Sequence, residues 1–406
     1  MAKRTVISSI DVGTTKVCTA VAELTEEGKV RVIGVGITPS NGMHKGMVVN
    51  INEAKDSIRQ SVRKAEQACG RRIESAYVGV TGRHVTSLNN HGVVSITRGD
   101  RMVRTEDLRR VVQSSQNIKV PNDRRLLHVI PRSYAVDGEA TVKNPVGMHG
   151  YRLDVETHVI TAAVSSVQNL AKCIRGVGID IDELVLEPLA SAEAVLTDAE
   201  KELGAILADI GGGTTDIAVF KDGAIFHTSV LPVAGYQLTR DIAIGLGLPF
   251  DVAEEMKKKY GTVMPVYDSR MSSDAMVGNG HRASYQDLCD ILRARVEEIL
   301  RLTVLELPRE DYKTLVPAGL VLTGGSSNVA GIDALGRDIL HMPVRVGSPL
   351  DIEGISEGLR DPAYATGVGL LMWAARLRNR PYRAKRTGFF NLGVKRIVTQ
   401  LAGLFR

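Results

Sequence analysis

The chain has 406 residues, enough for about two to four compact units, and its 44% hydrophobic but only 4% aromatic composition excludes a disordered chain and predicts an aliphatic core. Its four cysteines, Cys18, Cys69, Cys173 and Cys289, are far apart in sequence, which excludes a Cys-x-x-Cys metal or redox pair. The net charge is +5, but residues 376–406 hold nine Lys or Arg and no acid, so residues 1–375 carry a net charge of −4. This basic C-terminal segment predicts an acidic partner, either nucleic acid or anionic lipid.

The N-terminal part predicts a small sheet followed by a helix. Residues 5–12, 18–24 and 30–37 read as three strands in hairpin succession, without the apolar run and cleavage site of a signal peptide. Residues 52–70 carry apolar or small side chains at helical spacing, which predicts an amphipathic helix, and 74–82 read as a strand. No run reaches the ~18 to 20 uninterrupted apolar residues that a membrane-spanning helix requires.

Residues 85–160 change the pattern and predict an inserted subdomain. Three strand-like runs accompany a basic helix near 105–118. The insert also holds His128, His149 and His158, which lie at no metal-ligand spacing and are interpreted as structural or surface residues.

The opening pattern recurs after residue 203. SSIDVGTTKVCTAVAEL at 8–24 and LADIGGGTTDIAVFKDG at 207–223 both place Asp, Gly and two Thr at the end of a strand. Such a duplication predicts two related halves that face each other. Residues 235–310 read as largely helical around a loop at 262–284, and a helix through 364–377 closes the body before a linker.

The two Asp-Gly-Thr turns are typical of a phosphate site. Glycine-rich hairpins expose backbone N–H groups, and Thr hydroxyls add hydrogen bonds. The phosphate-side residues are then Gly13, Thr14, Thr15, Gly211, Gly212, Gly213, Thr214 and Thr215. Asp11 and Asp209 are expected to hold Mg²⁺ through water, because this ion keeps much of its hydration. One such turn could be a plain hairpin, but two turns followed by LTGGSS at 322–327 are a strong signal, and neither a P-loop nor a GxGxxG motif is found.

The sequence resembles the superfamily of actins, heat-shock chaperones and sugar kinases. DVGTTK at 11–16 and DIGGGTTD at 209–216 are similar to its phosphate hairpins, EPLASAEAV at 187–195 and PAYATGVGLL at 362–371 to its connecting helices, and LTGGSS to its adenosine loop. The resemblance implies an α/β fold of two duplicated actin-like (ribonuclease H-like) ATPase lobes that bind ATP and Mg²⁺.

The resemblance also implies roles for single residues. Glu187 matches the residue that orients the hydrolytic water, so Glu187 and Asp209 are the catalytic candidates for weak hydrolysis only, and Lys16 matches a position near the phosphates. The nucleoside-side candidates are Gly235, Glu254, Lys257, Gly324, Gly325 and Ser326. For residues 253–259 a solvated, charged helix face is the alternative.

Within that superfamily the chain resembles the FtsA family of bacterial cell-division proteins, because HVIPRSYAVDG at 128–138 and NPVGMHGYRL at 144–153 are similar to the insert of that family. The implied division is a first lobe at 1–84 and 161–200, an SHS2-like insert (subdomain 1C) at 85–160, a second lobe at 201–234 and 311–378, a second-lobe subdomain (2B) at 235–310, a basic linker at 379–390 and a membrane-targeting helix at 391–406.

The tail itself predicts membrane contact. The apolar stripe consists of Leu392, Val394, Ile397, Val398, Leu401, Leu404 and Phe405, and Lys395 and Arg396 fall on the other face. At ~1.5 Å per residue the segment spans ~20 Å, so it can lie in the interface of an anionic membrane without crossing it. A terminal helix packed on its own domain is the alternative; nucleic acid is disfavoured because aromatic residues do not interleave with the cations.

The FtsA resemblance implies a peripheral protein of the cytoplasmic membrane at the division site. It would polymerise as an actin-like filament, anchor the tubulin-like division protein FtsZ, and help to recruit other division proteins. Arg293, Arg295 and Arg301 are candidates to receive the C-terminal peptide of FtsZ, with Arg295 first; pairing with acids of their own helix is the alternative. A kinase or phosphohydrolase, and a pilus-assembly relative without the basic tail, are the rival functions, and the sequence does not decide whether ATP is hydrolysed.

Overall fold

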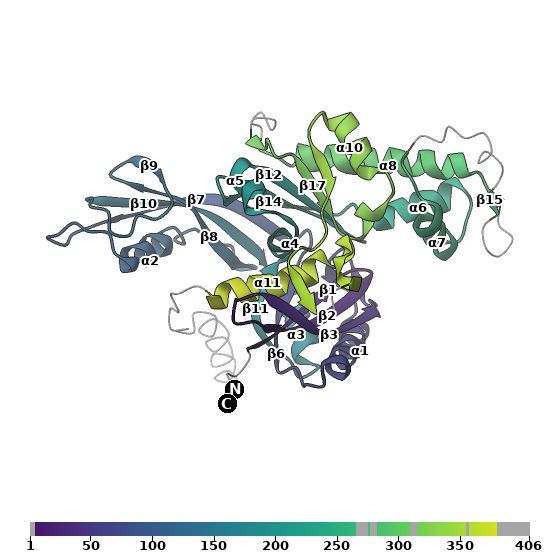
Figure 1. The fold of residues 1–406 in the computed structure, drawn as a ribbon, viewed down its shortest axis with the longest axis horizontal. Coiled ribbons are helices and arrows are strands. Elements are labelled where there is room, and N and C mark those ends of the chain that lie inside the picture. Colours follow the sequence, from purple (N-terminus) through teal and green to yellow (C-terminus); the bar gives the residue numbers. More distant parts are fainter. Residues whose placement is uncertain (1–4, 265–274, 277–281, 309–314, 355–356, 380–406) are drawn as a thin grey trace.

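The computed structural model describes residues 5–264, 275–276, 282–308, 315–354 and 357–379. Two lobes stack on each other, and a third subdomain projects to one side from between them (Figure 1). The membrane tail predicted at 391–406 and most of the predicted 262–284 loop lie outside the described residues.

The first lobe is a six-stranded sheet in the order β11-β6-β1-β2-β3-β19. Its strands are β1 (Val6–Val12), β2 (Lys16–Leu24), β3 (Val30–Pro39), β6 (Ser75–Val80), β11 (Asp180–Leu186) and β19 (Ile352–Gly354). β1 pairs antiparallel with β2 and parallel with β6, which in turn is parallel to β11, so the carboxyl ends of β1, β6 and β11 meet at one edge. The first phosphate turn lies at that edge.

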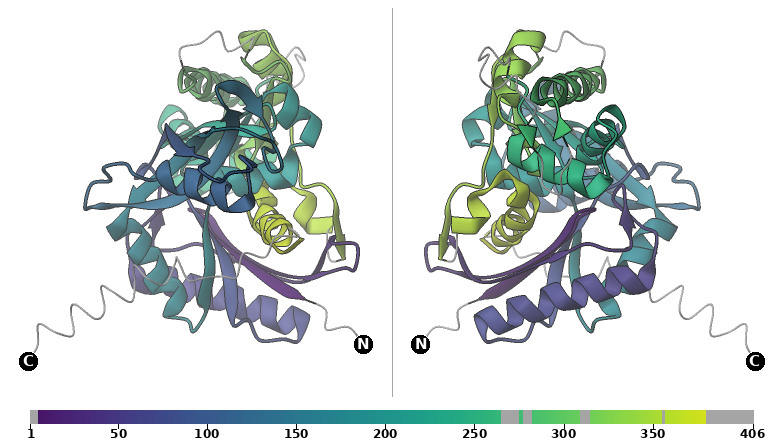
Figure 2. Two further views of the ribbon diagram at one scale, coloured as in Figure 1. Left: turned by 90° about the vertical axis from the view of Figure 1, so that its left-hand side faces the viewer. Right: turned by 90° about the vertical axis from the view of Figure 1, so that its right-hand side faces the viewer.

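Helix α1 (Ile51–Cys69) covers the outer face of this sheet, as Figure 2 shows. Asn50 caps its first turn by accepting from two backbone N–H groups, and Gly70 ends it in the left-handed conformation that glycine tolerates best. Gly36 of β3 allows a close approach, because a Cβ there would lie 1.9 Å from the Ser61 carbonyl oxygen. The predicted helix at 52–70 is therefore confirmed to within a residue.

The second lobe repeats the arrangement in a five-stranded sheet, β14-β13-β12-β17-β18. Its strands are β12 (Ala205–Ile210), β13 (Thr215–Lys221), β14 (Ala224–Leu231), β17 (Leu320–Thr323) and β18 (Val344–Val346). As in the first lobe, the opening strand pairs antiparallel with the second and parallel with a later one. The helices α5 (Asp198–Leu203) and α10 (Ile332–Leu340) pack against strands of this sheet. The helices α6 (Gly235–Gly245), α7 (Phe250–Tyr260) and α8 (Tyr285–Leu305) pack on one another at its side (Figure 1). The predicted duplication and the actin-like α/β fold are thus confirmed.

Two helices, α4 (Glu187–Val195) and α11 (Ala365–Asn379), lie between the lobes (Figure 1). The two helices pack directly on each other because Gly369 has no Cβ. A Cβ there would lie only 1.9 Å from the Ala190 carbonyl oxygen. α4 is buried on every side, and its residues share one hydrophobic core with the first sheet. Within the described ranges, no helix is both long and apolar enough to cross a membrane.

The insert is a four-stranded sheet, β7-β10-β8-β9, with α2 (Thr105–Ser114) packed against it. Its strands are β7 (Val85–Ser95), β8 (Arg124–Val136), β9 (Glu139–Val142) and β10 (Arg152–Ala163). A small separate core forms around buried side chains such as Ile96, Val111 and Leu153. The predicted helix near 105–118 is too long, because the Ser114 and Ser115 hydroxyls bond to carbonyls three residues back and end it.

The insert also contacts the second lobe. His158 of β10 is buried and bonds through Nδ1 to the Asn89 side chain (2.7 Å) and through Nε2 to the Thr228 hydroxyl of β14 (2.9 Å). Ser87 of β7 donates to the Thr228 carbonyl oxygen at 2.9 Å. Burial first, and then neighbouring cationic groups, lowers the pKa of His158 to about 3, so the ring is neutral. His158 is therefore a structural residue, as predicted.

The remaining short elements complete the chain. They are the hairpins β4 (Met43–His44) with β5 (Met47–Val48) and β15 (Ala275–Met276) with β16 (Arg282–Ala283), helix α3 (Val164–Arg175), and the 3₁₀ turns η2 (Gly325–Asn328), η3 (Glu357–Arg360) and η4 (Pro362–Tyr364). The four cysteines are all free thiols.

Candidate functional site

The two predicted phosphate turns face each other across the gap between the lobes. In the first, the Gly13 N–H donates to the Lys16 carbonyl at 3.0 Å; in the second, the Gly211 N–H donates to the Thr214 carbonyl at 2.9 Å. A Cβ at Gly212 would lie 1.9 Å from the Thr15 hydroxyl oxygen. A larger side chain at this position would therefore push the two hairpins apart, which explains why glycine is required there.

Four carboxyl groups lie buried behind these turns. Asp11 is the second-last residue of β1, Asp209 lies in β12, Asp216 is the second residue of β13 and Glu187 opens α4. Each is less than 9% exposed. Three of these positions were predicted and are brought together. Asp216 was not among the predicted site residues.

Hydroxyl groups supply part of the hydrogen bonding to these carboxylates. Asp209 accepts from Ser191 of α4 (2.5 Å) and from Thr366 of α11 (3.0 Å), so both connecting helices meet at this carboxylate. Asp216 accepts from the Thr214 hydroxyl at 2.9 Å and from Thr81, which follows β6 in the other lobe.

The cluster carries more negative charge than its surroundings neutralise. Burial raises the pKa of Asp11 to about 6; Lys16 lowers it and Asp209 raises it further. Burial likewise raises the pKa of Asp216 to about 7, the Thr81 and Thr214 hydroxyls lower it, and the charges of Asp209 and Asp11 raise it.

The other two carboxyls behave in the same way. Burial raises the pKa of Asp209, which the Ser191 and Thr366 hydroxyls lower. Burial also raises the pKa of Glu187 well above its ordinary value, and the charges of Asp11, Asp216 and Asp209 raise it further. A cation placed among these groups would stabilise all four ionised forms.

The donor set fits a hydrated magnesium ion better than a metal held by many side chains. Among the described residues, no group of three or more His, Cys, Asp or Glu is arranged to coordinate one metal directly. Mg²⁺ usually keeps several waters and takes one or two carboxylates plus substrate phosphates. Asp11 and Asp209 lie on opposing hairpins, and this arrangement fits the coordination that Mg²⁺ prefers.

Lys16 is a cation that lies beside the carboxyl cluster. Its ammonium group lies 4.8 Å from the centroid of the Tyr364 ring in η4, and it lowers the pKa of Asp11 and Asp209. Lys16 and Asp216 occupy equivalent places, since each directly follows the two threonines of its hairpin. The duplicated turns thus end in side chains of opposite charge.

The predicted nucleoside-side residues gather next to the second hairpin. The Ser326 hydroxyl and the Gly235 N–H both donate to the Gly211 carbonyl oxygen, at 2.8 and 3.1 Å. Gly324 has φ 84°, and a Cβ there would lie 2.4 Å from an Asp209 carboxylate oxygen. A Cβ at Gly325 would meet only the Ala363 methyl, at 3.5 Å, so Gly325 borders more open space.

Lys257 and Glu254 of α7 face inward. The Lys257 ammonium bonds to the Gly235 carbonyl (3.2 Å), the Thr239 hydroxyl (2.8 Å) and the Glu254 carboxylate (2.6 Å). Burial lowers the pKa of Lys257, and the Glu254 charge raises it. The alternative of a solvated face describes Lys258 instead, whose side chain is 64% exposed.

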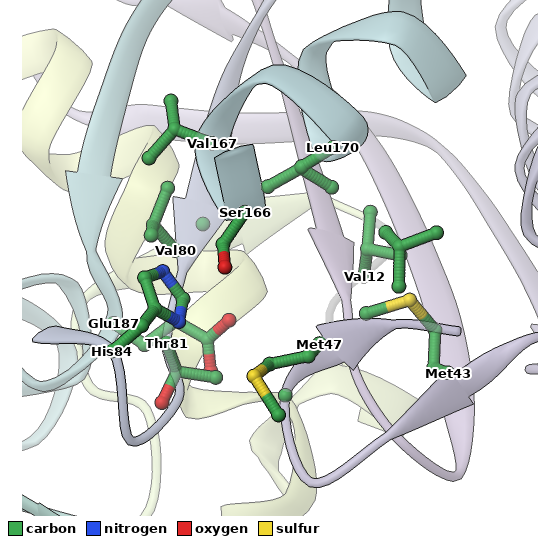
Figure 3. A pocket seen from close by; sticks show the side chains of 13 residues that line it. Val12, Met43, Met47, Val80, Thr81, His84, Ser166, Val167, Leu170 and Glu187 are labelled. Atoms are coloured by element: carbon green, nitrogen blue, oxygen red, sulfur yellow. The ribbon is translucent and has the colours of Figure 1, made fainter. Parts of the chain in front are cut away.

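A small cavity borders the cluster on the first-lobe side (Figure 3). Its volume is about 10 Å³, close to the space that one water needs. Figure 3 shows Glu187, Thr81 and His84 on one side of it and Met43 and Met47 on the other. Within the described part of the chain, neither His84 ring nitrogen has a hydrogen-bond partner, and burial and then Arg124 lower its pKa.

Sequence reasoning missed the supporting residues Asp216, Ser191, Thr366 and Thr81. The motif DIGGGTTD contained Asp216, and strand alternation places it on the same side as Thr214, so this residue was within reach of the pattern. Ser191 and Thr366 lie within the quoted motifs of the connecting helices, and Thr81 follows β6, but nothing in the pattern distinguished these hydroxyl residues from other Ser and Thr residues.

The three predicted peptide-binding arginines lie on α8. Arg295 pairs with Asp241 of α6 at 2.5 Å and with Glu298 of its own helix. Arg301 pairs with Glu297, and Arg293 donates to the Val263 carbonyl oxygen at 3.2 Å. Pairing within the helix, the alternative reading, therefore holds for part of this group, while Arg295 also joins α8 to α6.

Comparisons with known proteins identify the family that the chain is similar to. Residues 206–369 match a family model described as cell division protein FtsA, and residues 82–161 match the SHS2 domain inserted in FtsA. The chain is 44% identical over 371 residues to cell division protein FtsA of Pseudomonas aeruginosa, covering 90% of this chain and 88% of that one. It is 36% identical over 379 residues to cell division protein FtsA of Escherichia coli (strain K12), covering 91% and 90%.

Two solved structures share the fold. The PilM–PilN type IV pilus biogenesis complex aligns with a TM-score of 0.64 at 18% identity, covering 92% of this chain and 99% of that one. MreB5 of Spiroplasma citri bound to ADP aligns with a TM-score of 0.55 at 15% identity, covering 92% and 97%.

Proposed function

The chain belongs to the FtsA family of cell division proteins, and from that premise we propose that it binds Mg²⁺ and ATP between its lobes and anchors FtsZ to the cytoplasmic membrane at the division site. The observation that supports nucleotide binding is the pair of opposed Gly–Thr turns beside four buried carboxyl groups, whose pKa values are raised. A solved structure of the same fold, MreB5, is bound to ADP.

In this proposal the magnesium ion supplies positive charge to the carboxyl cluster, and the triphosphate supplies oxygens that the two turns bind. Asp11 and Asp209 hold the hydrated ion, and Lys16 offsets phosphate charge. The turns (Gly13, Thr14, Thr15 and 211–215) bind phosphate oxygens in this proposal. The Gly13 and Gly211 N–H groups and the Thr214 hydroxyl are already bonded within the protein, so the remaining N–H groups of the turns and the exposed Thr15 would make these contacts. Gly324, Gly325, Ser326, Gly235, Glu254 and Lys257 line the nucleoside end.

Hydrolysis, if it accompanies binding, is slow. In this proposal Glu187 orients a water; this residue lines a cavity with room for about one. Burial and the charges of three neighbouring acids raise the pKa of Glu187, which disfavours the ionised form that a general base needs in the nucleotide-free protein. We therefore expect turnover far below the ~10 s⁻¹ that is typical of enzymes. The site suits a conformational switch more than a metabolic enzyme.

We place the FtsZ contact on the face formed by α6 and α8. Asp241 of α6 holds Arg295 on this face, and Ile244 at the end of α6 is 69% exposed. Arg293 lies about 200° around α8 from Arg295 and bonds to Val263 instead, and Arg301 lies one to two turns further on. A carboxylate of an incoming peptide would take the place of Asp241 on Arg295, which gives a charge-assisted, bidentate contact. The exposed isoleucine would cover an apolar side chain of the same peptide.

The membrane contact comes from the amphipathic pattern at 391–405. Its apolar stripe and the basic linker at 379–390 provide two signals for binding to anionic lipid. Assembly into actin-like filaments on that surface would add avidity, since many weakly anchored tails act together.

Reconstitution tests the adaptor function. Anionic vesicles should carry FtsZ to the pellet only in the presence of the full chain, and deletion of residues 385–406 should abolish this. FtsZ without its C-terminal peptide, or the substitution Arg295→Glu, should leave this protein on the vesicles and FtsZ in solution. Equal sedimentation with and without residues 385–406 would favour the pilus-assembly rival, whose fold PilM shares. A steady turnover near ~10 s⁻¹ with a small-molecule acceptor would favour a kinase.

A further inference from the structure

A basic hollow lies at the end of the first lobe that is remote from the nucleotide turns. It has a volume of about 590 Å³ and is lined by Arg63, Glu66, Gln67, Gly70, Arg71 and Arg72, at the carboxyl end of α1. Three guanidinium groups against one carboxylate give the hollow a net positive charge.

Two of these cations are uncommitted. Arg71 is paired with Glu23 of β2 at 2.9 Å, and Glu66 accepts from the Ile73 backbone N–H at 2.9 Å. Arg63 and Arg72 are exposed, and neither has a hydrogen bond or ion pair within the part of the chain that the structure describes. Cations favour a helix carboxyl end, which accounts for Arg71 and Arg72 but not for Arg63, a turn and a half earlier.

The position of the hollow in the fold indicates what it faces. A Cβ at Gly34 would lie 2.7 Å from the Cys69 side chain, so the end of α1 lies over the first half of β3. The phosphate turns lie beyond the other end of this strand, since Lys16 pairs with Pro39. α1 occupies the outer surface of the lobe, on the far side of the sheet from α11 (Figure 2).

The described chain ends near the same end of the first sheet, on the face opposite α1. Arg378, in the last turn of α11, hydrogen-bonds to Tyr77 of β6, and β6 begins three residues after Arg72. The linker at 380–390 can span at most about 36 to 40 Å when extended. A tail bound to lipid therefore keeps this end of the lobe close to the bilayer.

We propose that the hollow of Arg63, Arg71 and Arg72 binds the phosphate headgroup of an anionic membrane lipid, and so fixes how the first lobe is oriented on the bilayer. The inference rests on the membrane binding of the proposed function. Guanidinium groups suit this ligand because they grip phosphate oxygens in pairs. With the hollow on lipid, the nucleotide cleft and the α6–α8 face point away from the membrane, free for filament and peptide contacts.

The test compares two double variants of the full chain with equal loss of charge. Arg63→Gln with Arg72→Gln removes the uncommitted cations; Lys119→Gln with Arg240→Gln removes two exposed cations of the insert and of α6. Each cation near an anionic surface is worth about a factor of five, so the first variant should bind phosphatidylglycerol vesicles about 10- to 25-fold more weakly. The control should change less than about threefold, and ATP binding should be the same in both.

Hydrogen exchange supplies the second readout. Wild-type protein on phosphatidylglycerol vesicles should gain protection over residues 63–73, and the tail-deleted chain should show none. Loss of vesicle affinity equal in the two double variants, or no protection at 63–73, would overturn the headgroup site while leaving the tail anchor intact. Saturable binding of inorganic phosphate that requires Arg63 and Arg72, without any change in vesicle affinity, would assign the hollow to a soluble anion instead. Failure of wild-type protein to bind these vesicles at all would refute the membrane anchor itself.

Discussion

The substitution Asp216→Asn tests the carboxyl cluster through its cost to the nucleotide-free fold. Asp216 is 3% exposed and has a pKa of about 7 against an ordinary value near 3.8. A shift of that size corresponds to about 4 kcal/mol of lost stability once the group is ionised, since each pKa unit is worth ~1.4 kcal/mol. Asparagine keeps the shape and removes the charge. Its amide oxygen accepts from one of the Thr81 and Thr214 hydroxyls, and the other hydroxyl must turn to accept from the amide NH₂ group.

The sign follows from proton binding. Between pH 4 and pH 7 the folded state holds a proton on Asp216 that the unfolded state has lost, so stability falls as pH rises through this window. The gain from Asp216→Asn should therefore be smallest near pH 4.5 and grow by about 2 to 3 kcal/mol by pH 8. In thermal unfolding of the nucleotide-free protein this corresponds to a rise of about 3 to 6 °C at pH 8.

Asp338→Asn is the matched control, because it removes an exposed carboxylate from α10. Its unfolding midpoint should follow that of the wild type at every pH. If the Asp216→Asn midpoint also ran parallel to the wild type from pH 4.5 to 8, ionised Asp216 would cost the fold nothing, and the inferred charge imbalance would be wrong.

Three further predictions concern other contacts. Lys257→Ala removes an ammonium group that makes three hydrogen bonds, so ATP affinity should fall at least tenfold and the free energy of unfolding by about 1 to 3 kcal/mol. Lys258→Ala, at an exposed position, should change little in either ATP affinity by titration calorimetry or stability by thermal unfolding. Gly212→Ala should weaken ATP binding by a similar factor because the methyl meets the Thr15 hydroxyl, while Gly99→Ala, with open space around it, should be silent in the same assay. Buried His128 and His158 have pKa values of about 4 and 3, against an ordinary value of 6.5. Their contribution to stability is therefore present above pH 6.5 and is lost as the pH falls below it, by about 2 kcal/mol each at pH 5. His158→Gln should reduce this loss of stability at acid pH in a series of unfolding midpoints, and an unchanged loss would show that the ring is not buried in its neutral form.

Much of the fold follows from patterns that the chain repeats. Alternating β-branched residues and the duplicated Asp-Gly-Thr turns predicted two related sheets, and spacing at Ile58, Val62 and Ala65 predicted α1, since these depend on local periodicity. The insert was recognised from a change in pattern, but its contact with β14 through His158 could not be predicted, because it joins residues 70 positions apart.

The site shows the same division. The turns and their acids were predicted because they are contiguous motifs, whereas Ser191 and Thr366 act on Asp209 from two helices that only the folded chain brings together. The charge balance was also out of reach: Asp216 has a raised pKa because of burial and of acids that come from distant segments.

Magnesium-dependent ATP binding tests the central claim most directly. Titration of the full chain with ATP should give saturable binding with Mg²⁺ and binding at least tenfold weaker when the metal is chelated, because the phosphates then lack the ion that Asp11 and Asp209 are proposed to hold. At about 100 times its Kd, MgATP should stabilise the fold by ~2.7 kcal/mol, and Asp11→Asn should reduce the dependence on the metal. Absence of ATP binding, or equal affinity with and without Mg²⁺, would contradict the account.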